Sequence, residues 1–133
     1  MKVGRLALAL ALLLAPLQAM AGHGASGLVP GYRAEHVKRL IDAGERVVLV
    51  DLRPAPAFGK GRLPGARSIP LAELARRVAE VPRSGRVILY GETIIEASEA
   101  AKLLEPLGYR NIGVLEDGFT GWVAVGLPIE RSR

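Results

Sequence analysis

The 133-residue chain carries 18 Lys and Arg residues against 13 Asp and Glu, so its formal net charge is +5, and it contains no cysteine. The absence of cysteine excludes disulfides, thiolate-bound zinc, iron–sulfur clusters and a cysteine nucleophile. Half of the residues are apolar and only 5% are aromatic, a composition typical of one globular domain and not of a stacking platform for single-stranded nucleic acid.

The N-terminal residues have the pattern of a secretory signal peptide. Two basic residues precede an apolar run over residues 6–17, and Ala-Met-Ala follows at 19–21, matching the small-x-small pattern of signal peptidase sites. The run is shorter than the roughly 20 residues of a membrane span. We therefore predict a signal peptide over residues 1–21, cleaved after Ala21, and a mature protein in a bacterial periplasm or secreted. An uncleaved membrane anchor is the alternative.

Removal of the signal peptide lowers the charge of the mature chain. Sixteen basic and thirteen acidic residues remain, a net charge of +3, which is too small to indicate a nucleic-acid partner. Residues 22–30 are rich in glycine and are expected to form a flexible lead-in. The folded domain is expected over residues 31–133.

The first half of this domain predicts a helix, a strand and a long loop. Apolar residues recur at helical spacing between residues 34 and 41, and Gly44 follows as a stop signal. Residues 47–50 form a continuous apolar, β-branched run, which favours a strand buried on both faces. Asp51 ends that strand. Residues 53–65 hold three prolines and three glycines and predict a loop.

The second half alternates between helical and strand patterns. Apolar residues at helical spacing predict a helix over residues 71–78 and another lined by Ala97, Ala100, Ala101 and Leu104. Strands are expected at 87–90 and 112–115, and a short helix around Trp122. Strands that alternate with helices indicate right-handed crossovers and a parallel sheet. Function in such folds gathers where the carboxyl ends of strands lead into loops, here residues 51–53 and 91–96.

Five motifs in a fixed order resemble those of a single rhodanese-like domain. The chain reads Leu-Val-Asp-Leu-Arg at 49–53, Gly-Arg-Leu-Pro-Gly-Ala-Arg-Ser-Ile-Pro at 61–70, Gly-Tyr-Arg-Asn-Ile at 108–112, Asp-Gly-Phe-Thr-Gly-Trp at 117–122 and Gly-Leu-Pro-Ile-Glu at 126–130. The resemblance covers about residues 32–130. It implies a three-layer α/β domain, a parallel sheet of about five strands with helices on both faces.

The resemblance also implies where sulfur-transfer chemistry would lie. In this family a cysteine at the end of the central strand takes a sulfane sulfur as a persulfide, held by backbone N–H groups, a helix N-terminus and an arginine. Aligned on Ala100-Ala101, the cysteine position is Gly91, the loop arginine falls on Glu96 and a loop glycine falls on Ile94. Glycine has no side chain to carry sulfur, so rhodanese-type catalysis is not expected and no catalytic residue is assigned.

The same loop, Gly91, Glu92, Thr93, Ile94, Ile95 and Glu96, supports a different interpretation. Thr93 and Glu96 match a capping box, Ser/Thr-x-x-Glu before an apolar periodic run. Our hypothesis is that the helix starts early, that Ile94 joins its apolar face, and that Glu96 and Glu92 satisfy the N–H groups that would otherwise hold an anion. A longer, well-capped helix without any further role is the alternative. A functional alternative is that the loop binds a partner, with Ile95 as a projecting apolar contact residue, an interaction knob, between Glu92 and Glu96.

Outside the loop, charged residues border the same expected site. Asp51 and Arg53 are expected to form a pair that orients the loop. Arg53, Arg62 and Arg67 are candidate contacts for an anion or a partner, because guanidinium groups suit anion recognition. Neither a metal site nor a cofactor is predicted.

The function expected from these residues is that of an exported, catalytically inactive rhodanese-like domain acting as a binding or regulatory module. Its partner would be a periplasmic protein, with small sulfur anions as further ligands. The alternative from another class is a sulfur-handling protein that binds thiosulfate or polysulfide, or transfers sulfur with a partner's thiol. The third possibility is a domain that keeps the fold as a structural relic and binds no ligand.

Overall fold

A computed structural model of the chain describes residues 29–133, so the predicted signal peptide and residues 22–28 of the lead-in lie outside the described residues. Five strands form one sheet in the order β1-β5-β4-β2-β3, and every neighbouring pair is parallel. The strands are β1 (Gly31–Tyr32), β2 (Val47–Asp51), β3 (Arg67–Ser68), β4 (Arg86–Tyr90) and β5 (Ile112–Leu115).

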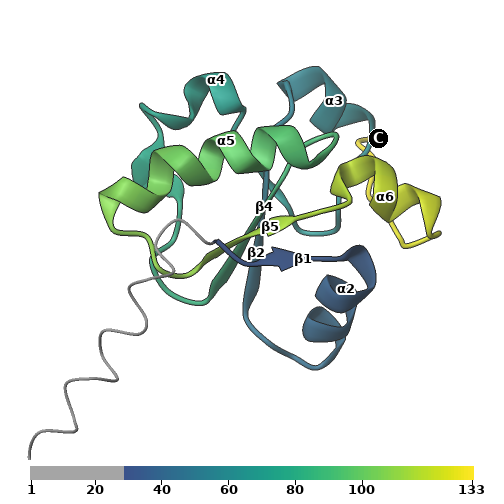
Figure 1. The fold of residues 1–133 in the computed structure, drawn as a ribbon. Helices are drawn as coiled ribbons and strands as arrows, with labels where there is room; N and C mark the ends of the chain where they lie inside the picture. The colour runs from purple at the N-terminus through teal and green to yellow at the C-terminus, as the bar shows by residue number, and fades with distance from the viewer. Residues whose placement is uncertain (1–28) are drawn as a thin grey trace, which may run out of the picture.

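Helices cover both faces of this sheet. They are α2 (Ala34–Asp42), α3 (Ala55–Lys60), α4 (Leu71–Leu74), α5 (Ile94–Leu104) and α6 (Gly118–Ala124), with the 3₁₀ turns η3 (Val78–Glu80) and η4 (Glu105–Leu107). Figure 1 shows α4 and α5 on one side of the sheet and α2 on the other. The predicted three-layer α/β fold with about five parallel strands is therefore confirmed.

Two hydrophobic clusters lie on the two faces because side chains alternate along a strand. In β4, Val87 and Leu89 belong to the cluster beneath α4 and α5. Ile88 and Tyr90 belong to the cluster that includes residues of α2 and the fully buried Trp122. The continuous apolar runs in the sequence thus mark strands that are covered on both sides.

Two predictions about local structure are wrong. The segment 53–65 contains helix α3, for which Pro54 is the N-cap and Pro56 lies in the first turn, where proline is compatible with a helix. The helix predicted over 71–78 ends at Leu74, and η3 follows separately after Arg77. Leu71 and Val78 still pack on the core, so the apolar spacing was real although the helix was not continuous.

No helix among residues 29–133 is long and apolar enough to cross a membrane.

Candidate functional site

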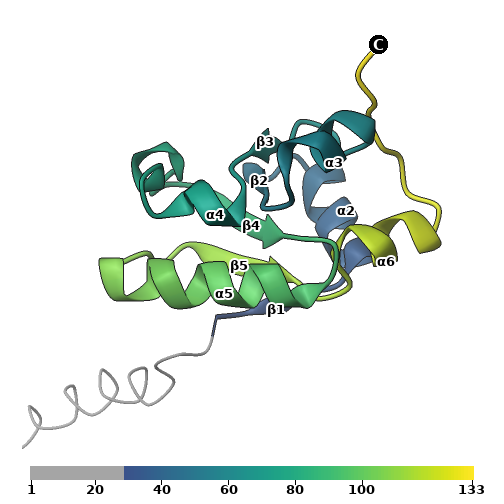
Figure 2. The ribbon, with the colours of Figure 1, turned by 90° about the horizontal axis from the view of Figure 1, so that it is seen from above.

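The loop between β4 and α5 lies at the carboxyl end of the central strand, where the sequence placed the candidate site. Figure 2 shows this loop turning back beside α6 before α5 begins. Backbone hydrogen bonds fix that arrangement, because the N–H of Phe119 donates to the carbonyl of Gly91 over 2.8 Å and that of Thr120 to the carbonyl of Glu92 over 3.2 Å. The loop is thus held from both the sheet and α6.

The predicted capping box is present and α5 begins at Ile94. The hydroxyl of Thr93 accepts from the N–H of Ile95 over 3.3 Å. The carboxylate of Glu96 reaches back and accepts from the N–H of Glu92 over 3.1 Å and from that of Thr93 over 3.4 Å. Two backbone donors of the loop, the N–H groups of Glu92 and Thr93, are therefore taken by the chain's own acid.

Glu96 also fills the space beside Gly91. A Cβ atom built on Gly91 would lie 2.5 Å from both Cβ and Cδ of Glu96, far inside normal van der Waals contact. Any side chain at position 91, a cysteine included, requires the first turn of α5 to move. Gly91 and Glu96 therefore form one mutually dependent arrangement.

Gly118 permits the close approach of α6 to this loop. Its φ is +63°, and a Cβ there would collide with the carbonyl oxygen of Glu92 and with Cα of Thr93. The side chain of Thr120 adds a contact of its own, donating from Oγ1 to Glu92 over 3.3 Å. Sequence reasoning missed this role of the 118–120 segment, for which the Asp-Gly turn signal was the only local sign.

Arg53 lies buried beneath the loop and is 3% exposed. Its Nε and Nη2 donate to the fully buried Asp51, the latter over 2.7 Å, and Nη2 also donates to the carbonyl of Gly61 over 2.6 Å. Nη1 reaches Glu92 at 3.5 Å, and the guanidinium stacks 3.9 Å from the ring centroid of Phe119. Arg53 thus links β2, α6 and the 91–96 loop.

Charge and burial together set the protonation states in this network. Burial alone would lower the pKa of Arg53, but its hydrogen bonds and attraction to Asp51 raise the pKa overall. Burial raises the pKa of Tyr90 well above its ordinary value, and Asp51 adds to the shift because the Tyr90 hydroxyl donates to it over 2.6 Å. Arg53 therefore stays charged and Tyr90 stays neutral.

The other two candidate arginines lie apart from the loop, in contact with different segments. Arg62 lies 3.7 Å from the carboxylate of Glu130 and donates to the carbonyl of Phe58 and the hydroxyl of Ser132. Arg67 donates to the carbonyl of Glu80 over 3.4 Å and is exposed. The structure brings only Arg53 of the three into contact with residues 91–96.

The surface of the loop is apolar with acidic neighbours. Ile95 is 67% exposed and Ile94 is 39% exposed. Ile94 lies within α5 at the spacing expected for its apolar face, but it is not buried with that face, because only the later apolar residues of the helix, from Ala97 onward, reach the core. Glu92 and Glu96 flank this exposed pair, an arrangement compatible with the knob inferred from the sequence.

A shallow pocket of about 260 Å³ lies next to the loop. Its apolar wall includes Phe119, Val123 and Ile129, and its basic residues are Arg53, Lys60 and Arg131. Among the described residues, no cluster of His, Cys, Asp and Glu has the arrangement of a metal site.

The chain is similar in sequence to one protein family and to several known proteins. A family model described as the rhodanese-like domain matches residues 33–125. The chain is 39% identical over 102 residues to an HTH-type transcriptional regulator of Mycobacterium tuberculosis, covering 75% of this chain and 44% of that protein. It is 32% identical over 92 residues to a sulfurtransferase of Allochromatium vinosum, covering 69% of this chain and 85% of that protein.

Solved structures show the same fold. The rhodanese-like domain of the Alr3790 protein from Anabaena sp. matches with a TM-score of 0.71 and 26% identity, covering 78% of this chain and 80% of that one. The chain thus spans less than half the length of the mycobacterial regulator and most of the Allochromatium protein. Its relatives include sulfurtransferases and regulators.

Proposed function

The chain belongs to the rhodanese-like domain family, and on that basis we propose that it is an exported, catalytically inactive member that acts as a binding or regulatory module. One observation carries the proposal. Glu96 accepts from two backbone N–H groups of the loop, and it fills the space that a sulfur-bearing side chain at position 91 would need. A chain without cysteine cannot form a persulfide of its own.

Electrostatics at the loop supports the loss of anion binding. Glu92 and Glu96 place two carboxylates beside the backbone N–H groups at the position where active members of the family hold the sulfur. Because thiosulfate is also negatively charged, repulsion disfavours its approach. The nearby cation Arg53 is already engaged by Asp51, Glu92 and a carbonyl oxygen. It has little free capacity to hold a small anion.

The partner surface that we propose is centred on the exposed Ile95. Apolar residues flanked by acids suit a partner that offers an apolar hollow bordered by Lys or Arg, because complementary charge guides association while apolar burial supplies affinity. The partner would be a periplasmic protein, met after export.

The catalytic half of this proposal is tested with thiosulfate and cyanide. Sulfur transfer breaks the S–S bond of thiosulfate, releases sulfite and delivers the sulfur to cyanide as thiocyanate. We expect no thiocyanate above a protein-free control from the chain, nor from Gly91→Cys alone, since Glu96 still blocks that position. The double change Gly91→Cys with Glu96→Gly shows whether removing the block is enough to restore transfer. Turnover by the unaltered chain would overturn the proposal.

The proposed binding of a periplasmic partner is tested by photo-crosslinking from position 95 in living cells that export the protein. We expect one dominant adduct from a crosslinker at position 95, lost when Glu92→Lys reverses the flanking charge. The matched control is a crosslinker at Val125, another exposed apolar position, 46% exposed. Equal adducts from both positions, or an adduct indifferent to Glu92→Lys, would contradict a specific surface at the loop.

A second function is favoured by the pocket of Arg53, Lys60 and Arg131 beside Phe119. Two exposed cations over an apolar wall suit a small sulfur anion such as thiosulfate or polysulfide, handed to a partner that supplies the thiol. An NMR titration with thiosulfate separates the two candidates. Saturable shifts at Lys60, Gly61 and Arg131 would favour sulfur-anion binding, whereas their absence leaves the protein-binding module.

A further inference from the structure

A second and larger pocket lies at the opposite edge of the sheet, where the strands begin. Its volume is about 390 Å³, within the range of small-molecule sites. It is lined by residues that lie just before β1, β2, β4 and β5 and by residues within β1, β4 and β5, and it shares no lining residue with the pocket beside the 91–96 loop. Nothing in the proposed function uses this edge.

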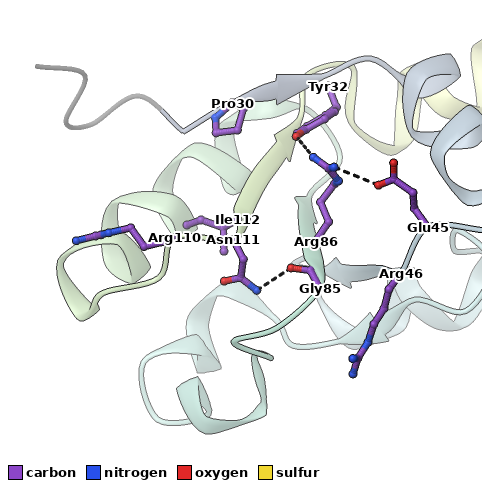
Figure 3. Close-up of a pocket in the computed structure, with 9 residues that line it drawn as sticks. All are labelled: Pro30, Tyr32, Glu45, Arg46, Gly85, Arg86, Arg110, Asn111 and Ile112. Carbon is purple, nitrogen blue, oxygen red and sulfur yellow. Dashed lines mark hydrogen bonds and ion pairs between the residues drawn. The ribbon is translucent and has the colours of Figure 1, made fainter. Parts of the chain in front are cut away.

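Arg86 forms the centre of this pocket, as Figure 3 shows. Its Nη1 donates to the hydroxyl of Tyr32 over 2.6 Å, and its Nη2 donates to Glu45 over 3.1 Å. Its Nε is buried and has no acceptor within the described part of the chain. A buried donor without an acceptor is costly, and a ligand oxygen reached by a small shift of Arg86 would satisfy it.

Two further arginines stand at the rim. In Figure 3 the guanidinium groups of Arg46 and Arg110 extend outward on different sides of Arg86. Neither guanidinium group has a hydrogen-bond or ion-pair partner among residues 29–133, although the carbonyl of Arg46 accepts from the N–H of Arg86. The stem of Arg46 is seated against Gly85, where a Cβ would come within 3.2 Å of it. Both long side chains have the freedom to swing over a ligand.

The charge balance of the pocket is positive. Three arginines face one acid, Glu45, which already pairs with Arg86. Guanidinium groups bind carboxylates and phosphates through paired N–H donors, and Tyr32 keeps its own O–H as a further donor. We propose that this pocket binds a multivalent oxyanion of the carboxylate or phosphate class, with Arg86 at its base and Arg46 and Arg110 closing over it.

The proposal is tested by titrating the full chain with citrate and, separately, with pyrophosphate, while recording backbone amide shifts. We expect saturable shifts concentrated at residues 85–86 and 110–112 that weaken with added salt. Binding of one probe alone identifies the ligand as a carboxylate or a phosphate, and binding of both identifies the site as general for oxyanions.

Three variants make the outcome decisive. Arg46→Glu with Arg110→Glu is expected to weaken binding by about tenfold or more, because two attractive charges become repulsive. Glu45→Gln is expected to strengthen it, an effect that a merely structural pocket would not produce. Arg39→Glu with Arg133→Glu changes the net charge equally at exposed sites outside the pocket and should leave affinity nearly unaltered. Shifts spread evenly over all basic residues, no saturable shift, or equal affinity in all variants would overturn the proposal.

Discussion

Single side chains decide what the loop after β4 can do. Glu96 accepts hydrogen bonds from two backbone N–H groups and lies within 2.5 Å of the place that a Cβ at position 91 would take. Thr93 completes the cap. Beneath them, the neutral hydroxyl of Tyr90 and the cation of Arg53 share the fully buried Asp51. These contacts give predictions that concern one residue at a time.

Replacing Thr93 with alanine should destabilise the domain, because the N–H of Ile95 loses its acceptor. Loss of an N-cap side chain costs about 1 kcal/mol. The measurement is the free energy of unfolding in urea, with Ser98→Ala in the body of α5 as a matched control. A cost for Thr93→Ala no larger than that of the control would mean that the cap contributes nothing.

The raised pKa of Tyr90 predicts a loss of stability at alkaline pH. Because the folded-state pKa lies above the ordinary value of 10.0, the contribution is complete below pH 10 and declines as the pH rises further. Above pH 10 the unfolded state ionises first, and the slope from this group approaches about 1.4 kcal/mol per pH unit. Urea unfolding between pH 8 and 11 should show a steeper decline for the wild type than for Tyr90→Phe, and parallel slopes would contradict the argument.

At the scale of elements, the start of α5 and the end of β4 form one unit, held by α6. The early helix start is possible only because position 91 lacks a side chain, and α6 approaches the loop closely only because Gly118 lacks a Cβ atom. The buried pair Asp51–Arg53 joins the end of β2 to this unit. A change in one of these elements should therefore be felt in the next.

A double-mutant cycle measures that dependence. Gly91→Ala is expected to cost about 1–3 kcal/mol of unfolding free energy through overpacking, and less in a chain that already carries Glu96→Gly. The coupling between the two changes should be about 0.5–3 kcal/mol. Gly59→Ala is the control, because nothing lies within 4 Å of a Cβ there, and it should be nearly neutral. Strict additivity would show that the two positions are independent.

At the scale of the whole molecule, the parallel sheet has two edges with different surfaces. The edge at the carboxyl ends of the strands presents the apolar and acidic loop, with exposed Ile95 between Glu92 and Glu96. The edge at the amino ends presents the arginine-lined pocket around Arg86. The two proposed ligands, a protein partner and an oxyanion, would therefore not compete for the same residues.

Export is the prediction that concerns the chain as a whole. The basic start, short apolar run and Ala-Met-Ala sequence favour cleavage after Ala21. N-terminal sequencing of the protein from a periplasmic extract should begin at Gly22. Ala21→Arg should block processing and leave a longer chain, which serves as the control. Recovery of the wild type in the membrane fraction with Met1 still present would favour the uncleaved anchor instead.

The sequence alone was enough to predict a parallel sheet, the positions of its three longer strands and the capped start of α5. Each of these depends on local patterns: apolar runs for strands buried on both faces, helical spacing, and Thr93 with Glu96 at a fixed separation. The sequence did not predict α3, because the prolines near its start are also typical of loops. It also did not predict that the following helix ends at Leu74.

Only the tertiary structure decided how these elements contact one another. The sequence named Asp51 and Arg53 as a pair, but the burial of Arg53 under Phe119 joins residues far apart in the chain. The blocking of position 91 by Glu96 depends on a side-chain direction, and the arginine pocket gathers segments that are separate in sequence. Local patterns specify elements because backbone geometry is local, whereas sites arise from packing, which brings distant residues together.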